Sequence, residues 1–101
     1  MILVVIRMKV LSEKHLELSQ TIASLIESIM QEKGCRSCEF CQNVMKENEL
    51  YLLEEWNTPE NLMNHLKSEL FKVLRGAMNL LREPYEMMFH TVSPPADLEK
   101  I

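Results

Sequence analysis

The residue best placed for acid–base chemistry in this chain is a histidine at the edge of a short predicted helix. His65 follows Leu62 by three residues and directly precedes Leu66, so it borders the apolar stripe of that helix. A neutral imidazole with a pKa of about 6.5 can take a proton from a phenol or hydroquinone. The sequence therefore allows His65 to be a general base, and a histidine bonded to a backbone carbonyl at a helix end is the structural alternative.

Acidic, aromatic and basic side chains on predicted strands are further candidates for a site. Glu55 and Trp56 are consecutive, so their side chains must point to opposite faces of a sheet. One of them could line a pocket, and Trp56 is equally suited to plain core packing. Arg7 and His90 are polar groups within apolar strands, where an unpaired charge is costly. Each therefore needs a partner or a ligand, and a salt bridge from Arg7 to a glutamate is the alternative to substrate binding.

Three cysteines form a C-x-x-C-x-x-C pattern whose spacing is compatible with zinc or an iron–sulfur cluster. On a regular strand, Cys35 and Cys41 would share one face about 20 Å apart, and Cys38 would lie on the other face. Thiolates arranged in that way cannot bind one ion, so we expect no metal. Reduced, partly buried thiols are the expected state, with a thiol-based redox sensor as the alternative.

Hydrophobic periodicity predicts the elements that must position these residues. Strands are predicted over residues 2–10, 35–46, 50–56 and 85–92, and helices over residues 13–32, 59–67 and 68–82. This order is the split βαβ pattern of an α+β, ferredoxin-like βαββ(αα)β sandwich with a four-stranded antiparallel sheet. We expect one domain over residues 1–92 and a flexible C-terminal tail over residues 93–101.

Local signals mark where several helices begin and end. Ser12 is the predicted N-cap of the first helix, and Thr58 with Pro59 marks the start of the second. Gly34 supplies a left-handed stop after the first helix. Gly76 lies inside the last helix, where it is costly relative to alanine, and this suggests a close approach of another backbone.

Composition and charge limit the class of protein. The 101 residues are 47% apolar and 26% charged, which is typical of one folded domain. The net charge is −4, and no basic cluster is present to bind nucleic acid. The apolar start, residues 1–6, is too short to cross a membrane and lacks the flanks of a secretory signal. We therefore expect a cytoplasmic protein that binds neither nucleic acid nor membranes.

The predicted sheet has helices on one face only. Its strands offer few polar side chains to the other face, and a bare apolar sheet face is too large a patch for a soluble monomer. We therefore expect a homodimer formed through the helix-free face.

Three stretches of the chain resemble the antibiotic biosynthesis monooxygenase (ABM) domain family of the dimeric α+β barrel superfamily. They are Gly34-Cys35, Leu53-Glu54-Glu55-Trp56, and P-E-N-L-x-x-H-L-x-S-x-x-F over residues 59–71. Together with the order of elements, the resemblance extends over residues 2–92. It implies a ferredoxin-like fold that dimerises through its sheets into a barrel. It also implies cofactor-independent oxygenation of a quinol or polyphenol in a cavity between sheet and helices.

The resemblance suggests roles for individual residues. We expect His65 to be the base, Arg7 or Arg75 to stabilise an anion, and Trp56 or Tyr51 to form a stacking wall. The predicted catalytic residues are thus His65, Trp56 and Arg7, and the predicted binding residues for a small aromatic or quinol-like ligand are Glu55, Tyr51, Arg75 and His90. Ser68 is followed by Glu69 and Leu70, where members of the family often carry a second histidine. The alternative function is a non-enzymatic small-molecule-binding or stress-associated dimer, because function does not follow from fold.

Overall fold

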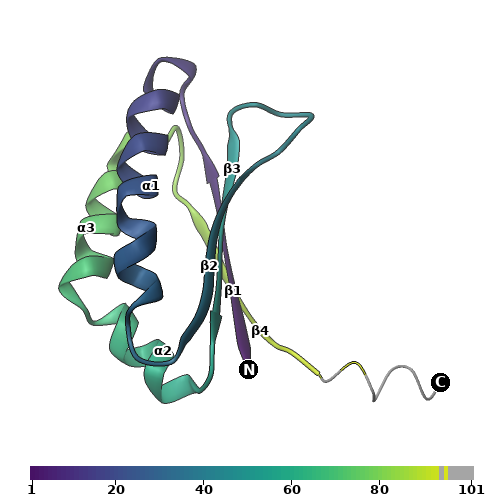
Figure 1. Cartoon of the computed structure of the whole chain (residues 1–101). Helices are drawn as coiled ribbons and strands as arrows, with labels where there is room; N and C mark the ends of the chain where they lie inside the picture. The colour runs from purple at the N-terminus through teal and green to yellow at the C-terminus, as the bar shows by residue number, and fades with distance from the viewer. Residues whose placement is uncertain (94, 96–101) are drawn as a thin grey trace.

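The chain folds into one antiparallel sheet with helices packed on one of its faces (Figure 1). The computed structural model describes residues 1–93 and 95, so the predicted tail lies outside the described residues except for Ser93 and Pro95. The strands are β1 (Ile2–Lys9), β2 (Cys35–Gln42), β3 (Glu49–Trp56) and β4 (Glu86–Thr91). The helices are α1 (His15–Met30), α2 (Pro59–Leu66) and α3 (Glu69–Ala77), with 3₁₀ turns η1 (Ser12–Lys14) and η2 (Met78–Leu80).

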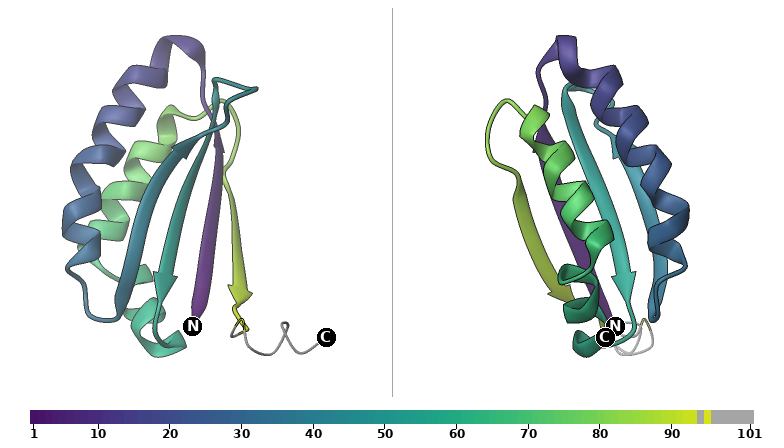
Figure 2. Two further views of the ribbon diagram at one scale, coloured as in Figure 1. Left: turned by 45° about the vertical axis from the view of Figure 1, so that its right-hand side comes forward. Right: turned by 90° about the vertical axis from the view of Figure 1, so that its left-hand side faces the viewer.

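The strand order β2-β3-β1-β4, with every neighbouring pair antiparallel, confirms the predicted ferredoxin-like α+β fold. Helices α1 and α3 lie across the same face of the sheet, and the described residues leave the opposite face uncovered (Figure 2). No described helix has the length and apolar character needed to span a membrane.

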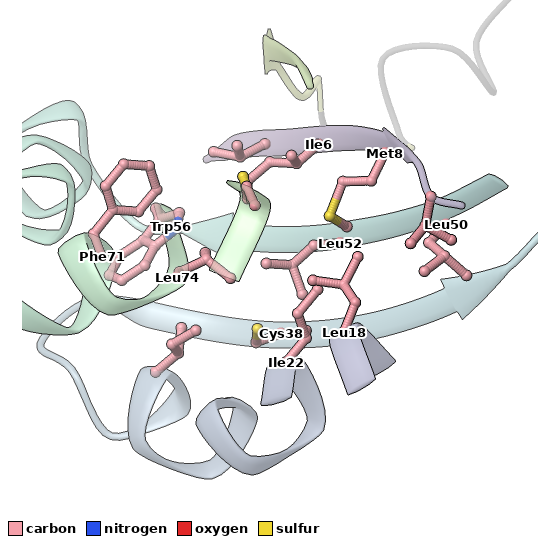
Figure 3. Packing of buried hydrophobic residues seen from close by; sticks show 14 of the residues in the cluster. Ile6, Met8, Leu18, Ile22, Cys38, Leu50, Leu52, Trp56, Phe71 and Leu74 are labelled. Atoms are coloured by element: carbon pink, nitrogen blue, oxygen red, sulfur yellow. The ribbon is translucent and has the colours of Figure 1, made fainter. Parts of the chain in front are cut away.

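The hydrophobic core fills the space between the helices and the sheet. Figure 3 shows side chains of β1, β3, α1 and α3 meeting there, with Trp56 and Phe71 together at one end of the core. The fully buried side chains include Ile6, Met8, Leu18, Ile22, Leu52, Trp56, Phe71 and Leu74. Because side chains alternate along a strand, the residues of β3 on this side are Leu50, Leu52, Glu54 and Trp56.

Of the two helix starts predicted from N-cap residues, the one at Thr58 matches the structure. The Thr58 hydroxyl accepts a hydrogen bond from the backbone N–H of Asn61, and Pro59 occupies the first turn of α2. The prediction for Ser12 is wrong, because α1 begins at His15 without a side-chain cap. Ser12 instead opens the 3₁₀ turn η1, and its hydroxyl accepts a hydrogen bond of 2.8 Å from the side chain of Asn48.

The close backbone approach occurs at Gly34, and the prediction that placed one at Gly76 is wrong. Gly34 has φ +84°, and its carbonyl accepts a hydrogen bond of 2.8 Å from the N–H of Asn57. A Cβ on Gly34 would lie 2.3 Å from Nδ2 of Asn61 in α2, whereas a Cβ on Gly76 would meet nothing within 4 Å. Gly34 therefore lets the turn after α1 pack tightly against the start of α2.

A β-bulge in β2 corrects the predicted arrangement of the cysteines. Cys35 pairs with Trp56 and Cys38 pairs with Glu54, so these two cysteines share the helix-covered face. Cys41 pairs with Tyr51 on the open face. The prediction that Cys35 and Cys41 share a face is wrong, because the extra residue between Cys35 and Ser37 interrupts the alternation. Among the described residues, no group of three or more His, Cys, Asp or Glu side chains is arranged to hold a metal ion.

Candidate functional site

His65 is enclosed by aromatic side chains at the end of the core. Helix α2 begins directly after β3, so the chain turns back and places His65 over Trp56, the last residue of that strand. The two rings are stacked with centroids 4.5 Å apart, and Phe71 of α3 meets His65 edge-on at 5.3 Å. The His65 side chain has no exposed surface. Its two nitrogens can therefore contact only other groups of the protein.

Glu54 provides one of these groups from the neighbouring strand. Its Oε1 accepts a hydrogen bond of 2.9 Å from the indole Nε1–H of Trp56 and lies 3.2 Å from Nε2 of His65. The second contact has the distance of an ion pair but not the alignment of a hydrogen bond, since Nε2 of His65 has no hydrogen-bond partner among the described residues. Glu54 Oε2 likewise has no partner there, although the side chain is only 1% exposed.

Glu32 pairs with the other nitrogen of His65. Its Oε2 is hydrogen-bonded to Nδ1 of His65, from the turn between α1 and β2. The Glu32 backbone carbonyl accepts a hydrogen bond of 3.1 Å from the N–H of Cys35, which fixes the turn beside Gly34. The Glu32 side chain is 22% exposed, so this end of the cluster reaches the solvent.

The two carboxylates determine the proton affinity of His65. Burial on its own lowers the pKa of the imidazole, but the nearby carboxylates of Glu54 and Glu32 outweigh it and raise the pKa above its ordinary value. The two carboxylates therefore make His65 a stronger proton acceptor than a free imidazole. Such a cluster can store a proton and return it, whereas an isolated buried imidazole would stay neutral.

The other predicted site residues fall on both sides of the sheet. Four of them, Arg7, Tyr51, Glu55 and His90, belong to the open face. The guanidinium of Arg7 lies 5.7 Å from the centroid of the Tyr51 ring. Arg75 is exposed on α3, with its guanidinium 5.1 Å from the centroid of Phe71. Of the seven predicted residues, the structure thus brings together His65 and Trp56, with Arg75 beyond Phe71.

Arg7, a partly exposed cation in a strand, forms two ion pairs. Its Nε lies 3.6 Å from Oε1 of Glu49, and its Nη1 lies 3.6 Å from Oε2 of Glu86. The Tyr51 hydroxyl donates a hydrogen bond to Glu49, which lowers the pKa of Glu49 together with the nearby cations Lys46 and Arg7. The salt bridge considered as the alternative for Arg7 is therefore present.

Glu54 and Glu32 are the members of the cluster that sequence reasoning did not identify. Glu54 could have been found from strand alternation, because residues 54 and 56 share a face and Trp56 was already a candidate. For Glu32 the sequence carries no comparable signal. It reaches His65 only because the turn at Gly34 packs against α2.

The cysteines near this cluster are shifted toward the neutral thiol. Burial raises the pKa of Cys35 to about 11, with a further contribution from the charge of Glu54. Burial also raises the pKa of Cys38, again with help from Glu54. Since the thiolate is the reactive form, these shifts count against a redox sensor built on Cys35 or Cys38.

Two surface hollows, each of about 360 Å³, lie away from His65. One is formed around Lys9, Lys46, Asn48 and Arg82, and the other around Glu27, Ser28 and Gln31 of α1 and the turn that follows it. Neither is lined by a member of the His65 cluster, and His65 itself has no exposed surface, so access of a ligand to His65 requires movement of the side chains that cover it.

Comparison with known proteins places this chain in a family. The family model described as "Antibiotic biosynthesis monooxygenase" matches residues 1–77. A conserved protein from Methanosarcina mazei Go1 has a similar structure, with 30% identity, a TM-score of 0.84, and coverage of 88% of this chain and 89% of that one. Rv0793 from Mycobacterium tuberculosis is 22% identical, with a TM-score of 0.86 and coverage of 94% and 97%. No curated protein matches the sequence.

Proposed function

Because the chain belongs to the antibiotic biosynthesis monooxygenase family, we propose that it is a monooxygenase that oxidises a quinol or polyphenol with O2 without a cofactor. The observation that supports this most directly is the buried His65, stacked on Trp56 and held between Glu32 and Glu54. An electron-rich phenol needs a proton acceptor and a dry, enclosed site in order to react with O2, and this cluster supplies both.

The proposed chemistry begins with loss of the phenolic proton. The O–H bond breaks, its electron pair stays on oxygen, and the resulting phenolate reduces O2. For a phenol with a free ring position, one atom of O2 enters the ring and the other leaves as water, so that phenol and O2 give quinone and water. The protein's tasks are to accept the proton, hold the anion and return a proton to the departing oxygen.

The residues of the helix-covered side have distinct roles in this proposal. His65, acting with Glu54, accepts and returns the proton, and Trp56 is the aromatic wall against which the substrate ring is aligned. Arg75 supplies positive charge for the anion from beyond Phe71. Phe71 must turn away to admit a ligand, because its ring meets His65 edge-on.

A homodimer through the open face completes the proposal. Leu53, Val5 and Met88 lie side by side across β3, β1 and β4 and form an apolar row on that face. A second copy seated on this row would remove its apolar surface from water. Arg7, Tyr51, Glu55 and His90 then belong to the interface between copies.

Oxygen consumption tests the proposed reaction. A naphthol is mixed anaerobically with the protein and then exposed to O2, and both O2 uptake and quinone absorbance are followed. We expect a rate above that in buffer and a loss of roughly 100-fold or more in His65→Ala, as is usual when a general base is removed. His15→Ala is the matched control, because His15 lies at the start of α1 away from the cluster. Equal rates for His65→Ala and wild type would overturn the role of His65. Thermal stabilisation by the naphthol without O2 uptake would instead favour the non-enzymatic binding function.

A further inference from the structure

Three titratable side chains form a line from the interior of the protein to its surface. Glu54 is 1% exposed, His65 is fully buried and Glu32 is 22% exposed. His65 stands between the two carboxylates, with Nε2 facing Glu54 and Nδ1 facing Glu32. A proton can therefore enter or leave this cluster through Glu32, the member that water reaches.

The inner end of the line carries an unused hydrogen-bond acceptor. Glu54 Oε1 is occupied by the indole N–H of Trp56, whereas Oε2 is buried without a partner among the described residues. An unpaired buried carboxylate oxygen is costly, and native proteins usually satisfy such atoms. A ligand hydroxyl that donated to Oε2 would satisfy it and would place its proton at the inner end of the line.

The other charged or titratable groups around His65 do not offer another route for its proton. Cys35 and Cys38 of β2 are close enough for the Glu54 charge to raise their pKa values, so they remain neutral thiols. Arg75 of α3 lies behind the Phe71 ring. Among the described residues, the groups that pair with the His65 nitrogens are the two carboxylates.

We propose that Glu54, His65 and Glu32 form a proton path, in which Glu32 is a positioning residue that orients the imidazole and exchanges its proton with water. This proposal deepens the proposed monooxygenase function and rests on it for the identity of the proton donor. Glu54 and Glu32 thereby take part in proton transfer in addition to His65, the predicted base.

Each step of the path conserves protons. The substrate O–H bond breaks as its proton moves to Glu54 Oε2, which leaves a phenolate and a carboxylic acid. After the carboxyl group turns, Glu54 passes the proton to Nε2 of a neutral His65 and becomes a carboxylate again. The imidazolium releases the proton on Nδ1 to Glu32, and Glu32 releases it to water. The same steps in reverse return a proton to the oxygen that leaves as water.

The test uses the free protein, so that it does not depend on turnover. Trp56 is the single tryptophan of the chain and stacks on His65, so its fluorescence follows the charge of the imidazole during a pH titration. Nitrogen NMR of histidine-labelled protein gives the position of the proton on the ring, and its line shape gives the rate of proton exchange with water. Wild type is compared with Glu32→Gln, which keeps the shape of the side chain but removes the charge, and with Glu32→Asp.

We expect Glu32→Gln to lower the proton affinity of His65 by about tenfold or more, because a neighbouring carboxylate is lost. We also expect it to shift the proton away from Nδ1 and to slow exchange with water. Glu32→Asp should restore part of each effect, and Glu27→Gln, an exposed change in α1, should have none. Unchanged proton position and exchange rate in folded Glu32→Gln would overturn the path.

The test of the proton path and the test of the oxygenase reaction can give different results. If wild type fails to consume O2 while Glu32→Gln alters His65 as expected, the proposed reaction is wrong and the proton path from Glu54 to water remains. If wild type consumes O2 and Glu32→Gln leaves His65 unaffected, the reaction remains and the path is wrong.

Discussion

The carboxylates of Glu32 and Glu54 face opposite nitrogens of a single imidazole. Glu32 comes from the turn after α1, 33 positions before His65, and Glu54 comes from β3. His65 therefore joins the first half of the domain to the second through polar contacts inside an otherwise apolar region. Breaking one side of such a buried cluster leaves a charge unpaired, which is strongly destabilising.

Stability should depend on pH through His65. Its pKa is raised in the folded protein by the two glutamates, in spite of burial, so the folded state binds the proton more tightly than the unfolded state. The resulting stabilisation is fully present below the unfolded pKa of about 6.5 and is lost as pH rises through the folded pKa. We expect the free energy of unfolding to fall over that range in urea titrations.

Two histidine variants isolate this contribution. In His65→Gln the decrease above neutral pH should be absent, whereas in His15→Gln it should persist. Parallel pH profiles for wild type and His65→Gln would contradict the link between His65 and stability.

The two glycines should respond in opposite directions to alanine. Gly34→Ala forces a Cβ into a position 2.3 Å from Asn61 Nδ2 and places a side chain at φ +84°. We expect a loss of about 1–3 kcal/mol in the free energy of unfolding. Gly76→Ala adds a Cβ in open space within α3 and should stabilise by roughly 0.5–1 kcal/mol.

The double variant Gly34→Ala with Asn61→Ala measures how much of the loss comes from the outer atoms of the Asn61 side chain. Asn61→Ala removes the contacts with Nδ2 and Cγ of Asn61 but leaves the contact of 2.6 Å with its Cβ and the backbone strain, so only a small part of the stability should return. Chemical denaturation measures all three variants, and a neutral Gly34→Ala change would show that the turn has room to relax.

The open face should be required for dimerisation. Val5→Glu places a carboxylate between Leu53 and Met88, and a second apolar face cannot cover it without desolvating the charge. Light scattering coupled to size-exclusion chromatography should give the mass of two chains for wild type and of one for Val5→Glu. Val73→Glu, at an exposed position of α3, is the control that should remain dimeric. A monomeric wild type would refute the interface.

The thiols of Cys35 and Cys38 should react slowly in the native protein. In a Cys41→Ser background, only these two remain of the three cysteines. Since the Cys35 pKa is about 11 and that of Cys38 is also raised, we expect a thiol reagent near pH 8 to label them 10-fold to on the order of 100-fold more slowly than after unfolding. Labelling at equal rates in folded and unfolded protein would contradict the burial of both groups.

Strong hydrophobic periodicity allowed the order of helices and strands to be predicted. It did not predict which residues of each strand face the helices and which face the open side. Both faces of residues 2–6 are apolar, so the sequence does not reveal that Ile6 faces the helices and Arg7 the open side. The bulge in β2 also has no clear signature in the sequence, and it reverses the expected side of Cys35 relative to Cys41. These two features decide which predicted residues meet.

The candidate site was predictable in its local part. His65 and Trp56 could be proposed from residue types and spacing, and Glu54 follows from alternation beside Trp56. The contact of Glu32 with His65 depends on tertiary packing at the turn that contains Gly34. In the sequence, Gly34 indicated only the end of a helix. Sequence patterns report local geometry, whereas the partner of Nδ1 is fixed by packing between distant segments.

The span of the site along the chain has a consequence for the order of folding. Glu54, Trp56 and His65 lie within residues 54–65, so their mutual contacts close only a short loop, whereas Glu32 must arrive from 33 positions away. Loop closure costs less entropy for nearby segments. We expect the inner part of the site to assemble with the β3–α2 unit and Glu32 to join it when α1 docks. His65 would thus acquire its final proton affinity only at the last stage of folding.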